Sequence, residues 1–181
     1  MFIPQQVFDD AMALTRRMVG RETGGFLVGH LCRDPGSDDL FARVAAQLPA
    51  RHTVPTETRL TFTPQTWDDM HDGLALRGDD ELLLGWWHSH PVRAWCANCP
   101  TDRQVVCHLA RDFFSRHDRA LHRTVFPRAY SVALVVNDIA FEDPDAVAVR
   151  LEARRHRFPR VLGDLVAHGH EYSRFMTRTT R

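Results

Sequence analysis

The stretch Leu82-Leu83-Leu84-Gly85-Trp86-Trp87-His88-Ser89-His90-Pro91 carries the strongest structural signal in the chain. Its first part, Leu82 to Trp87, is a continuous apolar run of strand length, which indicates a central buried strand. Residues two apart in a strand project from the same face, so His88 and His90 can share one metal ion. Pro91 then ends the strand. The stretch therefore predicts a pair of imidazoles at the carboxyl end of a buried strand, where open sites in sheets tend to lie.

Apolar spacing and turn residues predict helices and strands on both sides of this strand. We expect helices over residues 5–19, 64–76 and 101–116, a loop over 91–100 and a closing helix over 160–176. We expect further strands at 26–28 and 40–48, joined as a hairpin, and at 59–63, 130–136 and 146–151. This order favours a single α/β (α+β layered) domain over residues 1–181, with its core at about 5–156 and a tail or helix at 157–181.

Composition is that of an ordinary globular protein, with 181 residues of which 44% are hydrophobic and 25% charged. The formal net charge is zero, so no overall field gathers nucleic acid or an anionic membrane. The apolar runs fall short of the roughly 18 residues needed to cross a bilayer, and the first residues lack the basic region of a secretory signal. We therefore expect a soluble, cytoplasmic protein that binds neither nucleic acid nor membrane. All 23 basic residues are Arg, for which codon bias is the simplest explanation.

A catalytic zinc site needs a third protein ligand beside the two histidines and an open position for water. Asp102, at the start of the next expected helix, is the nearest carboxylate downstream. Hydrolysis also needs a separate group that moves the proton of the water, and Glu22 is the best candidate because the glycines after it let another strand approach closely. The alternative is that both histidines are hydrogen-bonded strand-end residues and that Glu22 is a solvated surface carboxylate.

The pattern Glu22-x-x-Gly25-x-Leu27-x-Gly29, followed by His88-Ser89-His90-Pro91 and Asp102, resembles the JAMM motif of the JAB/MPN metalloproteases. The resemblance implies the MPN fold, a central mixed β-sheet flanked by helices. It implies zinc bound by His88, His90 and Asp102, with Glu22 as the base that activates the zinc-bound water. The implied activity is hydrolysis of the bond after the C-terminal tail of ubiquitin or a ubiquitin-like protein, in deconjugation or precursor processing. E1- and E2-like conjugation proteins would be further partners.

The loop after Pro91 departs from the family pattern, which has six residues, a Ser, two residues and the Asp. That spacing would place Asn98 at the Ser and Thr101 at the Asp. One inserted residue restores the carboxylate as Asp102 and places Cys99 where the family has a Ser that helps to stabilise the oxyanion. A thiol is a poor hydrogen-bond donor, so either activity is reduced or the Asn98 amide takes that role. The alternative to an enzyme is a catalytically weak or inactive MPN scaffold that binds a modifier.

Three of the four cysteines, Cys96, Cys99 and Cys107, lie close together in the sequence, with His108 beside the last. These four residues would supply the ligands of a second, structural zinc. A short disulfide between Cys96 and Cys99 would instead be a redox pair, and inert buried thiols are the third interpretation. Cys99 could also ligate the catalytic ion. A zinc deaminase is disfavoured because His88-Ser89-His90 lacks the Glu of that signature.

Overall fold

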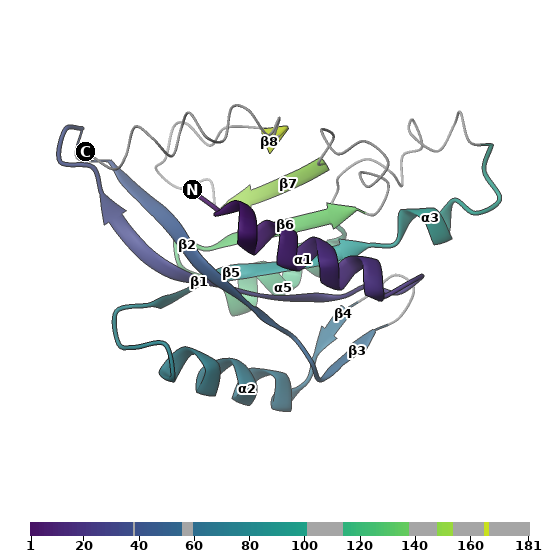
Figure 1. Cartoon of the computed structure of the whole chain (residues 1–181), viewed down its shortest axis with the longest axis horizontal. Helices are drawn as coiled ribbons and strands as arrows, with labels where there is room; N and C mark the ends of the chain where they lie inside the picture. Colours follow the sequence, from purple (N-terminus) through teal and green to yellow (C-terminus); the bar gives the residue numbers. More distant parts are fainter. Residues whose placement is uncertain (38, 56–59, 101–113, 138–147, 154–164, 167–181) are drawn as a thin grey trace.

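The computed structural model describes residues 1–37, 39–55, 60–100, 114–137, 148–153 and 165–166. These residues form an α+β fold around a mixed six-stranded sheet, in the order β2-β1-β5-β6-β7-β8, with β3 and β4 as a separate antiparallel pair (Figure 1). The strands are β1 (Gly24–Arg33), β2 (Leu40–Pro49), β3 (Thr53–Pro55), β4 (Leu60–Phe62), β5 (Leu82–His90), β6 (Val132–Asn137), β7 (Ala148–Ala153) and β8 (Leu165–Val166). The helices are α1 (Gln5–Arg17), α2 (Pro64–Ala75), α3 (Val92–Trp95) and α5 (Arg116–Val125). None of the described helices is long and apolar enough to cross a membrane.

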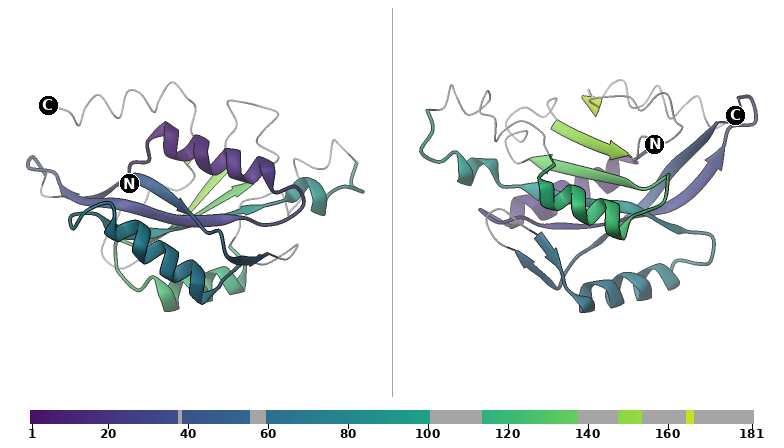
Figure 2. Two further views of the ribbon diagram at one scale, coloured as in Figure 1. Left: turned by 60° about the horizontal axis from the view of Figure 1, so that its bottom comes forward. Right: turned by 180° about the vertical axis from the view of Figure 1, so that it is seen from behind.

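Helices cover both faces of the sheet, with α1 on one face and α2 and α5 on the other (Figure 2). Successive side chains of a strand point to opposite faces, so each central strand contributes to two halves of the core. Leu27 and Trp87 pack in the half beneath α1, whereas Phe26 and Trp86 pack in the half with Met70 of α2. The end of β5 that carries His88 therefore presents it, like Trp86, to the face covered by α2 and α5.

The predicted elements of the first half of the chain are confirmed. Helix α1, the β1–β2 hairpin, β4 and α2 lie within a few residues of their expected positions, and β5 ends at His90, immediately before Pro91. Helix α2 begins at Pro64, where the missing N–H costs nothing, and the Thr63 side chain accepts a hydrogen bond from the Thr66 N–H. The expected strands near 130–136 and 146–151 are β6 and β7.

Three expectations for the second half need correction or lie outside the described residues. The expected loop over 91–100 contains the short helix α3, which follows Pro91 at its N-cap. The expected helix over 101–116 falls mostly outside the described residues, and a helix that the apolar spacing does not indicate, α5, begins at Arg116. Its buried residues are polar, Asp118 and His122, so a search for apolar periodicity passes over it. Residues 165–166 form a strand paired with β7 rather than part of a helix, because tertiary pairing overrides local spacing.

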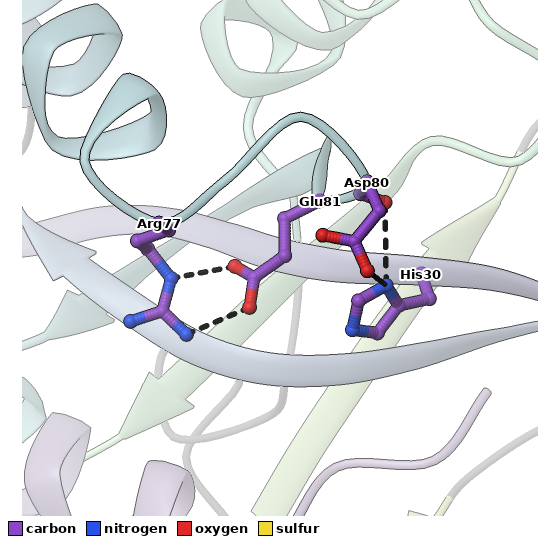
Figure 3. A network of polar contacts seen from close by, with 4 residues as sticks. All are labelled: His30, Arg77, Asp80 and Glu81. Carbon is purple, nitrogen blue, oxygen red and sulfur yellow. Dashed lines mark hydrogen bonds and ion pairs between the residues drawn. The ribbon is translucent and has the colours of Figure 1, made fainter.

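Two polar contacts tie the start of β5 to its neighbours (Figure 3). The Arg77 guanidinium donates two hydrogen bonds to the Glu81 carboxylate, at 2.5 and 2.9 Å, in the turn between α2 and β5. His30 Nδ1, on β1, lies 3.2 Å from the Asp80 carbonyl oxygen and 3.8 Å from its carboxylate. Bidentate pairs of this kind fix orientation as well as adding energy, so the Arg77–Glu81 pair stabilises the turn that leads into β5.

Candidate metal centre

The pairing of β1 with β5 brings Glu22 beside the histidine end of β5. The strands are antiparallel with Gly24 opposite His88, so the start of β1 lies next to the end of β5. The Ser89 N–H donates to the Thr23 carbonyl at 2.7 Å, and the Thr23 N–H donates to Ser89 Oγ at 3.0 Å. A Cβ on Gly24 would lie 2.4 Å from a carbonyl oxygen of β5, so this close approach requires glycine. The expectation that these glycines admit a neighbouring strand is thus confirmed.

A carboxylate that sequence reasoning missed, Asp118, completes a group with the two histidines. Because β5 and β6 are parallel, the chain must return from the end of β5 to the start of β6. Helix α5 makes the last part of this return, so its first turn lies at the carboxyl end of β5. Asp118, in that first turn, places Oδ2 3.6 Å from His88 Nε2. One ligand atom each from His88, His90 and Asp118 all lie within 4.8 Å of one another.

The geometry of this group fits a single metal ion. The Nε2 atoms of His88 and His90 face each other at 3.0 Å. Two nitrogens bound at about 2.0–2.1 Å to a tetrahedral zinc lie about 3.3 Å apart, close to this separation. The exposed fractions of His88, His90 and Asp118 are 1%, 2% and 7%. Two nitrogens and a carboxylate oxygen are a ligand set that zinc accepts, and three protein ligands leave a fourth position for water or substrate.

The protonation states of the ligands also suit a metal ion. Burial, together with the neighbouring His88, lowers the pKa of His90 to about 3 although Asp118 opposes this, so its imidazole is neutral. Burial works against ionisation of Asp118, but hydrogen bonds from His88 and Ser115 hold the pKa of its carboxyl below the usual range. Neutral imidazole and ionised carboxylate are the forms that bind metals.

Glu22 is buried rather than solvated, with 3% of its surface exposed, so the surface-carboxylate alternative is wrong. Burial and the charge of Asp118 raise the pKa of Glu22 to about 8, although a backbone hydrogen bond from Leu60 favours the ionised form. A cation held by the nearby ligands would also favour the ionised form. With a pKa of about 8 the Glu22 carboxyl is mostly protonated at pH 7, so it can act as a general base where a bound cation lowers this pKa.

The remaining predicted site residues follow Pro91 in the sequence. Asp102, Cys107 and His108 lie outside the described residues, and their roles stay predictions. Cys96 is buried and Cys99 is partly buried, and the Cys99 N–H donates to the Cys96 carbonyl at 2.8 Å in a turn that follows α3. Among the described residues, the group of three or more potential metal ligands is that of His88, His90 and Asp118.

A local signal could have identified Asp118. Ser115 caps α5: its Oγ accepts from the Asp118 N–H at 3.1 Å, while Asp118 Oδ2 accepts from the Ser115 N–H at 2.7 Å. This reciprocal capping box appears in sequence as a Ser followed three residues later by an acidic residue, and it marks a helix start. The two residues between Ser115 and Asp118 also match the Ser-x-x-Asp spacing of the JAMM motif.

Replacing Ser115 by Ala is expected to lower the free energy of unfolding by about 1 kcal/mol, because α5 loses its N-cap. Ser115→Asn, which keeps a capping oxygen, should stay close to the parent protein. Urea denaturation followed by circular dichroism measures both, with Thr124→Ala at an exposed position of α5 as the matched control. Equal stability of Ser115→Ala and the parent would show that the cap does not hold Asp118 in place.

Comparison with known proteins supports the fold. No protein-family model and no curated protein matches the chain. The chain resembles the solution structure of protein DSY2949 from Desulfitobacterium hafniense, with a TM-score of 0.53 and 17% sequence identity over 84% of each chain. At this identity the likeness concerns the fold alone. The fold and the site define an α+β protein with a buried His-His-Asp group suited to a metal ion.

Proposed function

We propose that the chain is a zinc metallopeptidase of the JAB/MPN class that hydrolyses the bond after the C-terminal tail of a ubiquitin-like protein. One observation carries the proposal: His88, His90 and Asp118 converge in a buried group at the carboxyl end of β5. The buried Glu22 lies just before the start of β1, which pairs with this end of β5. A strand-end pair of structural histidines would not need a third ligand and a second buried carboxyl group around it. The substrate class comes from the resemblance to the JAMM motif and is part of the proposal.

Within this proposal, Asp118 takes the ligand role expected of Asp102, and Ser115 takes the place expected of Cys99. Ser115 and Asp118 keep the family spacing of Ser-x-x-Asp, but they lie further from Pro91 in the sequence than the family pattern has them. Asp118 is also seen beside His88. The hydroxyl of Ser115 is a stronger donor than a thiol, which removes the objection raised by Cys99.

Each residue of the proposed site has a separate role in hydrolysis. Zinc held by His88, His90 and Asp118 would supply Lewis-acid chemistry at the scissile carbonyl and at the attacking water. Glu22 accepts the proton of that water and returns it to the leaving amine nitrogen. Ser115 Oγ accepts the Asp118 N–H and its O–H bonds the Asp118 carboxyl, so donation to the developing oxyanion would require this O–H to turn away from Asp118.

Metal analysis combined with a cleavage assay tests this proposal. The purified chain should bind one zinc ion and cleave an amide-linked reporter from the C-terminal tail of a ubiquitin-like protein, and a chelator should stop the reaction until zinc is restored. A chain that binds no zinc would contradict the proposal and favour the scaffold. A zinc-loaded chain that binds the modifier without cleaving it would favour a binding module.

A further inference from the structure

Trp86 packs flat against one of the proposed metal ligands. Trp86 and His88 lie two residues apart on β5, so both face α5. Their rings stack with centroids 4.8 Å apart and planes inclined by 12°. Phe62 meets the indole edge-on at 5.9 Å and Phe126 stacks near it at 6.3 Å, and only 1% of Trp86 is exposed. The indole is therefore enclosed, and the His88 imidazole lies nearly parallel to it.

The His88 ring depends on this packing for its orientation. A metal-binding histidine as a rule donates its second ring N–H to a carboxylate or carbonyl, which fixes the ring. His88 Nδ1 is buried and has no hydrogen-bond partner among the residues that the structure describes. Its other nitrogen, Nε2, faces His90 and Asp118. Phe114 also lies near the ring, with centroids 6.0 Å apart and a tilt of 58°, so the nearly parallel stack with Trp86 is the described contact that runs along the imidazole plane.

His122 in turn holds Trp86. The indole Nε1–H donates to His122 Nδ1 at 3.3 Å, and both side chains are buried. This bond requires an unprotonated Nδ1, so the ring proton of His122 lies on Nε2. The imidazole of His122 also stacks on Phe126, with centroids 6.0 Å apart and planes inclined by 16°. The indole cannot turn without breaking a buried hydrogen bond.

Helix α5 therefore reaches the metal centre at two points. His122 follows Asp118 by four residues, which places both on one face of the helix. They are the two buried residues of α5. Asp118 meets His88 directly, whereas His122 meets it through Trp86.

We propose that His122 is a positioning residue of the metal centre, which fixes the indole plane of Trp86 and through it the imidazole plane of His88. The inference rests on the proposed function for the role of His88 as a ligand. The packing itself is a property of the chain and can be tested separately from metal binding.

Substitutions at His122 test the inference through zinc affinity. His122→Phe keeps a ring and loses the acceptor, and it should weaken zinc binding about 10- to 100-fold, as for other residues that orient a ligand. His122→Gln, whose amide oxygen can accept the indole N–H, should keep most of the affinity. His71→Phe makes the same change at an exposed position of α2 and should bind zinc like the parent. Competition with a chromophoric chelator measures affinity, and circular dichroism checks folding.

A double-mutant cycle asks whether His122 acts through Trp86. Trp86→Phe keeps an aromatic ring that can stack against His88, but it removes the indole N–H that donates to His122. If the hydrogen bond carries the effect, His122→Phe should cost no further affinity in the Trp86→Phe background. The same loss in both backgrounds, or equal losses for His122→Phe and His122→Gln, would overturn the inference and leave His122 with a packing role.

Nuclear magnetic resonance of the chelator-treated protein separates this inference from the proposed function. His122→Phe should shift the Trp86 indole N–H signal and the ring-proton signals of His88, whereas His71→Phe should leave both in place. Unchanged His88 signals would overturn the inference whether or not the parent binds zinc. A parent that binds no zinc but shows the expected shifts would contradict only the proposed function.

Discussion

Glu22→Gln is expected to slow peptide hydrolysis by about 10²- to 10⁴-fold while zinc binding stays intact. That loss corresponds to roughly 3–5 kcal/mol of activation free energy. The amide has the size of the carboxyl group and can still accept the backbone hydrogen bond of Leu60, but it cannot take a proton from water. The measurement is kcat on a tail-linked reporter, together with zinc content by atomic emission.

Glu81→Gln is the matched control for this prediction. It makes the same chemical change at the opposite end of β5, where Glu81 pairs with Arg77. Its effect should be limited to stability, with kcat unchanged. Full activity of Glu22→Gln would remove Glu22 from the mechanism, and loss of zinc from that variant would instead assign it to the ligands.

Asp118→Asn is expected to weaken zinc binding by at least about 100-fold, and activity should fall with it. Removal of a direct ligand should cost no less than the 10- to 100-fold seen for residues that only orient ligands. The amide oxygen can still accept the Ser115 N–H, so the capping of α5 is largely kept. The affinity is measured by chelator competition, and thermal unfolding in excess chelator shows whether the fold is preserved.

Asp102→Asn provides the comparison that decides the third ligand. Both residues follow the histidine pair, and both substitutions remove one negative charge. Retained zinc in Asp102→Asn with loss in Asp118→Asn is the expected result. The reverse pattern would show that Asp102 is the ligand and that Asp118 is a structural partner of His88.

The parts of the site that follow from local pattern could be predicted from the sequence. The apolar run before His88 and the Pro after His90 define a strand end, and the two-residue period puts both imidazoles on one face. The structure confirms that the two rings lie together. The glycines after Glu22 likewise indicated a close neighbouring strand, and Gly24 lies opposite His88.

The local capping pattern marks Asp118 as part of a helix start, but it does not place Asp118 beside His88, because that contact depends on topology. Asp118 reaches His88 only because β5 and β6 are parallel and α5 returns along the sheet. A fixed spacing counted from Pro91 cannot represent such a return. The burial of Glu22 is also non-local, since Leu60 of β4 and Asp118 of α5 both contribute to its environment.

The histidine pair lies on β5 and Asp118 lies on α5, so the geometry of the proposed metal centre does not depend on the length of the segment between these elements. Residues 92–114 separate Pro91 from the cap of α5, while the ligand positions depend on a strand end and a helix start. Insertions at this point can therefore accumulate over evolution, or be engineered as grafts, without displacing the ligands. Searches for related centres should let the distance between His-x-His-Pro and Ser-x-x-Asp vary.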